Sequence, residues 1–171
     1  MVLIESAYLT VKCRSEKSAE EFLHAFTASS HVLSLFKSLF GGVRKETVRI
    51  EIKDKLDNLY DKVAKHLDMW KVKRKGKTII EVYDNEGQLH QQYEYLYGKT
   101  KLDYAAWYVF QLNTIFLNME VLTEAVLAHE LSHAIVGTYL GFKLPRRPAE
   151  VLARNVDKHL YSKLREYREW G

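Results

Sequence analysis

The chain has few of the residues that mark secreted, disordered or membrane-spanning proteins. Its 171 residues include only two prolines and one cysteine. Because a single cysteine, Cys13, excludes an intramolecular disulfide and fits a reducing compartment, we expect a cytoplasmic protein. No apolar run approaches the ~20 residues that a membrane-spanning helix needs. Residues 1–12 also lack the basic start and long apolar stretch of a signal peptide, so we expect no membrane contact.

Composition and charge indicate an ordinary globular protein. Hydrophobic residues make up 47% of the chain and charged residues 28%, which favours one domain over residues 1–171 with a well-developed core. The formal net charge is +4, and residues 143–168 are visibly basic. A solvated helix face accounts for this basic stretch, and weak attraction to acidic partners is the alternative. No nucleic-acid-binding motif is present in the sequence, so we expect no nucleic-acid partner.

The most informative segment is His-Glu-Leu-Ser-His at residues 129–133. On a helix, two histidines four residues apart lie one above the other and can hold one metal ion. Residues 121–140 contain no proline and are apolar nearly all round, which predicts a buried helix. Buried polar groups need partners, and one metal ion would satisfy His129, Glu130 and His133 together. The alternative is a pair of core histidines bonded to backbone groups, with Glu130 paired to a lysine.

This segment resembles the H-E-x-x-H signature of the zincin metallopeptidases, in particular the gluzincins. The resemblance covers about residues 113–157. It implies a Zn²⁺ ion bound by His129 and His133, with Glu130 as the general base that takes a proton from water. The metzincin pattern, with glycine and then histidine after the second motif histidine, fails because residues 136 and 139 are Val and Tyr.

The gluzincin resemblance also implies a third metal ligand on the following helix. Glu150 lies seventeen residues after His133, behind a glycine and a proline-containing loop, and is the candidate. A downstream acid that orients a metal-bound histidine is also implied, and Asp157 is the nearest match. The alternatives are that Glu150 is stabilised by the helix dipole, and that Asp157 forms an ion pair with Arg154 or Lys158.

Two further features are implied by the resemblance. One is an edge strand, just before the metal-binding helix, that pairs with an extended peptide substrate. The matching segment, which could equally be an ordinary edge strand, is Asn113, Thr114, Ile115, Phe116, Leu117 and Asn118. The other is a second donor to the oxyanion, for which the sequence offers Tyr139, Tyr161 and Tyr167 without separating them. His159 could be a metal ligand or an oxyanion donor, and the alternative is a solvated histidine. Cys13 could be a thiol that blocks the metal, and the alternative is a residue of the core.

Local patterns predict the elements of the first half of the chain. We expect a strand at residues 7–11, a helix from Ser15 or Ser18 to about residue 28, and a helix at residues 32–40. Residues 47–52 alternate like a strand, and the apolar residues of 56–67 then recur at helical spacing. Residues 77–83 and 88–97 are expected to form a β-hairpin around a four-residue loop at 84–87.

The second half is expected to hold strands at residues 105–110 and 114–117, the metal-binding helix at 121–140, and a closing helix at 148–167. The predicted fold is therefore α+β, a small zincin-like domain with a mixed sheet, an active-site helix and a C-terminal helix. Residues 1–118 would form its upper α/β part and residues 119–171 the metal-binding and closing helices. Residues 1–75 have three possible roles, as part of the upper sheet, as a regulatory lid or as a pro-segment, and we favour the first.

These features favour a small zinc metallopeptidase that hydrolyses peptide bonds in peptides or proteins. The alternative is a zincin-like regulatory or binding module with a narrowly specific or latent site, which the short segment after the metal-binding helix motivates. A third possibility is a metal-free helical protein that uses its basic C-terminal face for interaction.

Overall fold

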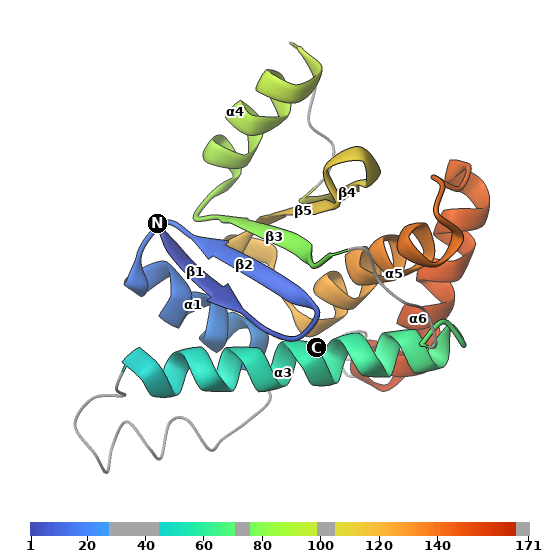
Figure 1. The fold of residues 1–171 in the computed structure, drawn as a ribbon, viewed down its shortest axis with the longest axis horizontal. Coiled ribbons are helices and arrows are strands. Elements are labelled where there is room, and N and C mark those ends of the chain that lie inside the picture. The colour runs from blue at the N-terminus through green and yellow to red at the C-terminus, as the bar shows by residue number, and fades with distance from the viewer. Residues whose placement is uncertain (28–44, 71–75, 99–104, 167–171) are drawn as a thin grey trace.

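A computed structural model describes residues 1–27, 45–70, 76–98 and 105–166 of the chain. Within these segments the fold is α+β, as predicted, with a five-stranded mixed sheet and five α-helices (Figure 1). The helix expected at residues 32–40 lies outside the described residues. Among the helices of the described segments, we find none with the length and apolarity that a bilayer crossing requires.

The sheet has the strand order β1-β2-β3-β5-β4. Its strands are β1 (Val2–Glu5), β2 (Leu9–Cys13), β3 (Thr78–Tyr83), β4 (Ala106–Val109) and β5 (Thr114–Asn118). The three central strands β2, β3 and β5 are parallel, and the outer strands β1 and β4 each run antiparallel to their neighbour. The strand expected at residues 7–11 is thus β2, shifted by two residues, and residues 1–27 supply part of the sheet, as we favoured.

Alternate residues of each central strand face opposite sides of the sheet. Ile80 and Ile115 point into the main core, which α1 (Glu16–Thr27), α3 (Lys45–His66) and α5 (Glu124–Leu140) cover. Phe116 and Trp107 point to the other face, where α4 (Glu86–Tyr97) packs over a smaller apolar cluster (Figure 1). The sheet therefore has a thick helical layer on one side, and this layer contains the candidate site.

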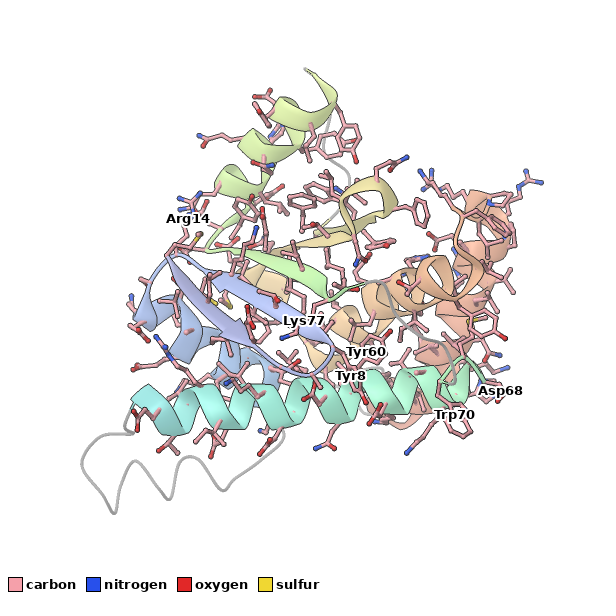
Figure 2. The ribbon with its side chains drawn as sticks, viewed as in Figure 1. Tyr8, Arg14, Tyr60, Asp68, Trp70 and Lys77 are labelled. Carbon is pink, nitrogen blue, oxygen red and sulfur yellow. The ribbon has the colours of Figure 1, made fainter. Side chains whose placement is uncertain are left out.

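The strand prediction for residues 47–52 is wrong, because this segment is the start of α3. The alternation of Val48, Ile50 and Ile52 suggested a strand, but Ile50 is 58% exposed. Val48 and Ile52 are buried and, four residues apart, begin the apolar stripe that Leu56 continues. At the other end of α3, Tyr60 packs against Tyr8 from the β1–β2 turn, with ring centroids 4.8 Å apart (Figure 2).

The hairpin predicted after β3 is also wrong, because residues 88–97 belong to α4. Asn85 caps this helix, since its side-chain oxygen accepts a hydrogen bond from the Gln88 N–H at 3.0 Å. The alternating tyrosines of the segment resemble a strand, but only Leu89 is fully buried and Tyr95 is 83% exposed. Local capping therefore prevails over aromatic content, and β3 pairs with β2 and β5 rather than with residues 88–97.

The other predicted elements are confirmed with small shifts at their ends. Helix α1 begins after Ser15, whose hydroxyl accepts a hydrogen bond from the Ser18 N–H at 3.0 Å. Strands β4 and β5 flank a short 3₁₀ turn at Phe110–Leu112, between the two strands predicted at residues 105–110 and 114–117. The closing helix α6 (Arg146–Glu166) starts two residues earlier than predicted, with Pro148 in its first turn.

Candidate metal centre

Helix α5 carries the two histidines and is fixed at both ends. Thr123 caps its start by accepting a hydrogen bond from the Val126 N–H, and Gly141, with φ 73°, ends it in the left-handed conformation that glycine tolerates. Nine of its residues are buried, which confirms the predicted buried helix. Among them Ser132 donates its hydroxyl proton to the His129 carbonyl at 2.6 Å, so this buried polar side chain is satisfied within the helix.

Helix α6 folds back against α5 and brings its acids to the histidines. It is fixed to its neighbours by the buried Tyr161, whose hydroxyl donates to Glu124 of α5 at 2.9 Å. Lys62 of α3 lies 3.4 Å from the same carboxylate and over the Tyr161 ring. The Asn155 side chain and His66 of α3 form a further contact of 2.7 Å. Three helices therefore meet along α6, and this contact fixes the position of the acids that α6 carries.

His129, His133 and Glu150 form one cluster that could hold a metal ion. Glu150 Oε2 lies 3.7 Å from His129 Nε2, and Glu150 Oε1 lies 3.7 Å from His133 Nε2. The three ligand atoms all lie within 4.8 Å of one another. Ligands at tetrahedral Zn–N and Zn–O distances of ~2.1 Å would be separated by ~3.4 Å, so only a small approach of side chains is needed. The donor set of two imidazoles and one carboxylate suits zinc.

Asp157 contacts the outer nitrogen of one of these histidines. Its Oδ2 lies 2.9 Å from His129 Nδ1, which leaves His129 Nε2 directed toward Glu150. Neither Arg154 nor Lys158 forms an ion pair with Asp157 among the described residues, although both were alternatives in the sequence. The second oxygen, Asp157 Oδ1, is buried without a hydrogen-bond partner among them. Asp157 is thus placed to orient a ligand ring through the nitrogen that a metal does not use.

Glu130 lies in the same cleft but does not belong to the ligand cluster. Burial raises the pKa of its carboxyl to about 7; the nearby His129 opposes this rise, and Glu150 and Asp157 add to it. A hydrogen bond from the Tyr108 backbone also favours the charged form. The carboxylate is therefore held by β4 in the cleft that also contains the cluster. A pKa near neutrality suits a group that accepts and returns a proton.

The second histidine is in the form that binds metals. Burial, helped by the neighbouring His129, lowers the pKa of His133 below its ordinary value. The imidazole of His133 is therefore neutral at pH 7, and a neutral imidazole has a lone pair available for a cation. The rings of His129 and His133 have centroids 5.1 Å apart and planes inclined by 74°, so they meet edge to face rather than stacked.

The cluster lies in a cleft of about 630 Å³ between a strand and a helix. One wall is formed by β4 and the turn after it, with residues Ala106, Trp107, Tyr108 and Phe110. The other wall is the α5–α6 loop and α6, with Lys143, Leu144, Arg146, Ala149 and Arg154 beside Glu150. Gly137, one turn after His133, permits the strand wall to approach α5, because an added Cβ would lie 2.9 Å from the Phe110 ring.

The structure corrects the strand assigned to substrate. Residues Asn113 to Asn118 were expected at an edge, but β5 is paired on both sides, with β3 and with β4. The outermost strand of the described sheet on this side is β4, which is also the strand that lines the cleft. The sequence prediction assigned the edge to β5 instead of β4, because no local pattern shows which of the two strands pairs on the outside.

The other candidates within the described residues are not part of the cluster. Tyr161 is buried with its hydroxyl on Glu124, Tyr139 does not line the cleft, and Tyr167 is outside the described residues. His159 of α6 is exposed and bonds to its own helix through the Asn155 carbonyl. Cys13 is buried in the main core, and burial raises the pKa of its thiol to about 12, so it is not a thiol facing the metal cluster.

Sequence reasoning missed two features of the cleft. The backbone contact from Tyr108 to Glu130 depends on the placement of β4, which no local pattern reveals. The cations of the helical wall were visible as a basic stretch, but only the fold of α6 shows that some of them face the cleft. Comparison of the chain with protein-family models, with curated proteins and with solved structures gives no match.

Proposed function

We propose that this protein is a zinc-dependent peptidase in which Glu130 is the general base. The observation that carries the proposal is the position of Glu150, which reaches the Nε2 atoms of both His129 and His133 from a separate helix. A second glutamate, Glu130, lies in the same cleft outside that cluster. Hydrolytic zinc sites use three protein ligands with a carboxylate nearby, whereas structural zinc sites use four protein ligands.

Different residues of the chain have different roles in the proposed hydrolysis. A bound zinc ion would supply a Lewis acid that lowers the pKa of water to about 7. As the water oxygen adds to the peptide carbonyl carbon, Glu130 accepts a water proton. When the C–N bond breaks, Glu130 returns that proton to the leaving amine, so its carboxylate is regenerated. Asp157 keeps the His129 ring in the orientation that directs Nε2 into the cleft.

We propose that the edge of β4, rather than β5, pairs with the substrate backbone. The Asn118 N–H donates to the Ala105 carbonyl, and register then pairs Trp107 with Phe116. In an antiparallel ladder the residues between such pairs direct their N–H and C=O groups away from the partner strand. Ala106 and Tyr108 therefore present backbone groups to the cleft, and the bond from Tyr108 to Glu130 agrees with this direction. An extended peptide would add a strand there.

The proposal extends to location and substrate. A cytoplasmic site of action is supported by the buried Cys13, because a lone cysteine cannot form a disulfide within the chain. A peptide or protein substrate is supported by the strand edge along the cleft, which offers backbone hydrogen bonds to an extended chain.

Removal of the metal is expected to abolish hydrolysis. Zinc-loaded protein should cleave unfolded casein or a peptide library, o-phenanthroline should stop cleavage, and one equivalent of added zinc should restore it. Mass spectrometry of the products measures the cut sites. A zinc-loaded protein that leaves every substrate intact would contradict the peptidase proposal and favour a zincin-like binding module. Cleavage that survives chelation would exclude a metal-dependent mechanism.

Asp157→Asn is expected to weaken zinc binding about 10- to 100-fold, because the amide is a poorer partner for the His129 Nδ1–H than a carboxylate is. Competition with a fluorescent zinc chelator measures the affinity. Lys158→Gln, on the exposed neighbouring position of α6, is the control and should leave zinc affinity unchanged. Equal affinity in wild type and Asp157→Asn would show that the contact of 2.9 Å does not orient a ligand.

A further inference from the structure

The two walls of the cleft differ in chemistry. The β4 wall presents the aromatic rings of Tyr108 and Phe110, which lie beside Gly137 of α5. The opposite wall presents three cations, Lys143 from the α5–α6 loop and Arg146 and Arg154 from α6. A cleft that needed only to hold a peptide backbone would not require charge of one sign on one wall. The cations therefore bear on which side chains the cleft accepts.

The two arginines flank the candidate ligand Glu150 along α6. Arg146, Glu150 and Arg154 are spaced four residues apart, so they lie on one side of the helix. A rise of 1.5 Å per residue places consecutive members of this row ~6 Å apart along the axis. The two arginines therefore lie on opposite sides of Glu150 along the helix axis, each about one helical turn from it.

The acids of the cleft do not neutralise Lys143 or Arg154. Glu130 is held by the Tyr108 backbone, Glu150 faces the two histidines, and Asp157 contacts His129. Among the described residues no ion-pair partner is found for Lys143 or Arg154, and both side chains are exposed. Their charge is therefore available to an anionic group that enters the cleft, and a bound divalent cation would add to the positive potential.

We infer that the cleft selects peptides that carry a carboxylate within about two residues of the bond to be cut, with Arg154 as its main partner. This inference rests on the proposed peptidase function for the position of that bond. Side chains on one face of an extended peptide repeat every ~6.6–6.8 Å, which matches the ~6 Å between Glu150 and Arg154. A guanidinium binds a carboxylate in a bidentate manner, so arginine gives direction as well as charge.

The carboxylate has two possible sources, an aspartate or glutamate side chain and the C-terminus of a short peptide. A phosphate of a nucleic acid would also be attracted to cations, but the strand edge at Ala106 and Tyr108 offers backbone pairing that only a peptide uses. The expected ligand is therefore a peptide, and an oligonucleotide is tested as the competing class of anion.

Binding is measured apart from cleavage, so that failure of the inference and failure of the peptidase proposal are distinguishable. Zinc-loaded Glu130→Gln protein is titrated with short dye-labelled peptides by fluorescence anisotropy, and metal-free wild-type protein provides a second non-cleaving form. The peptides share one sequence with a central glutamate, glutamine or lysine and an amidated end. A fourth peptide has glutamine and a free C-terminal carboxylate, and a thymidine oligonucleotide of similar charge is the fifth ligand.

The glutamate peptide, the free-carboxylate peptide or both are expected to bind about fivefold more tightly than the amidated glutamine peptide. Which of them shows the preference identifies the source of the carboxylate. Arg154→Gln should remove most of this preference and leave binding of the glutamine peptide unchanged. Lys158→Gln removes the same charge one turn further along α6 but outside the cleft, and should keep the preference. Arg154→Glu should shift the preference toward the lysine peptide.

Four results would overturn the inference. The first is equal affinity for all peptides, and the second is an equal loss of preference in Lys158→Gln, which would indicate the general positive charge of the protein. The third is a uniform loss of affinity for all peptides in Arg154→Gln, which would place that side chain on the peptide backbone. The fourth is tighter, Arg154-dependent binding of the oligonucleotide. If the protein prefers the carboxylate-bearing peptides but the wild type cleaves none of them, the inference on selectivity is supported and only the peptidase proposal is contradicted.

Discussion

Glu130→Gln is expected to reduce peptide hydrolysis about 10²- to 10⁴-fold while zinc content stays unchanged. The amide keeps the shape of the side chain and its acceptor for the Tyr108 backbone hydrogen bond, so the cleft should remain intact. It cannot accept a proton from water at neutral pH, and the step that generates the nucleophile is lost. Initial rates on a quenched fluorescent peptide, with zinc measured by mass spectrometry of the same sample, give both quantities.

The same experiment needs a control of equal chemistry. Glu94→Gln makes the same change at a half-exposed position of α4, on the opposite face of the sheet from the cluster, and should leave the rate within about twofold of wild type. Full activity in Glu130→Gln would remove Glu130 from the mechanism. Loss of zinc together with activity in this variant would instead indicate that Glu130 is a metal ligand, contrary to its position outside the cluster.

Glu150→Ala is expected to weaken zinc binding at least about 10²-fold and to reduce hydrolysis accordingly. Loss of an outer partner of a ligand typically costs 10- to 100-fold in metal affinity, so loss of a direct ligand should cost more. Glu150 is partly exposed near the start of α6, and its removal leaves the buried Ala153 and Val156 contacts in place. The affinity is measured by competition with a chelator, and circular dichroism measures the fold.

Asp54→Ala is the control for this change, because it removes one negative charge from an exposed position on α3 for which no hydrogen bond or ion pair is found among the described residues. Its zinc affinity should equal that of wild type. If Glu150→Ala binds zinc as tightly as wild type, the two histidines hold the metal with some other ligand, and the three-residue site described above is wrong. At saturating zinc the Glu150→Ala variant should still have low activity, because a site with two protein ligands holds the ion in a different geometry.

The sequence was sufficient to predict the parts of the site whose geometry follows from a single helix. The spacing of His129 and His133 and the apolar surroundings of their helix are local properties, and both are found in α5. The resemblance to the gluzincins implied an acidic ligand on the next helix, and Glu150 was the candidate because it follows a glycine and a proline-containing loop. The geometry agrees, because α6 packs along α5 and carries Glu150 to the two rings.

The parts that could not be predicted depend on contacts between distant segments. The edge of the sheet was misplaced because strand order is set by pairing, and β4 and β5 have similar sequences of aromatic and branched residues. Helix α4 was taken for a strand because its tyrosines have high strand propensity, and the capping by Asn85 decides otherwise. The position of Arg154 in the cleft follows from the angle at which α6 returns, which residue spacing does not give.

X-ray absorption spectroscopy at the zinc edge, on protein loaded by equilibrium dialysis, tests most directly whether one ion is held by both histidines and Glu150. The account predicts one zinc per chain, with two imidazole nitrogens and carboxylate or water oxygens at about 2.0–2.2 Å and no sulfur ligand. In Glu150→Ala the imidazole signal should persist at much lower occupancy, and in a His129→Ala/His133→Ala variant it should vanish. Wild-type protein that retains no zinc, or a double variant that retains it fully, would contradict the account.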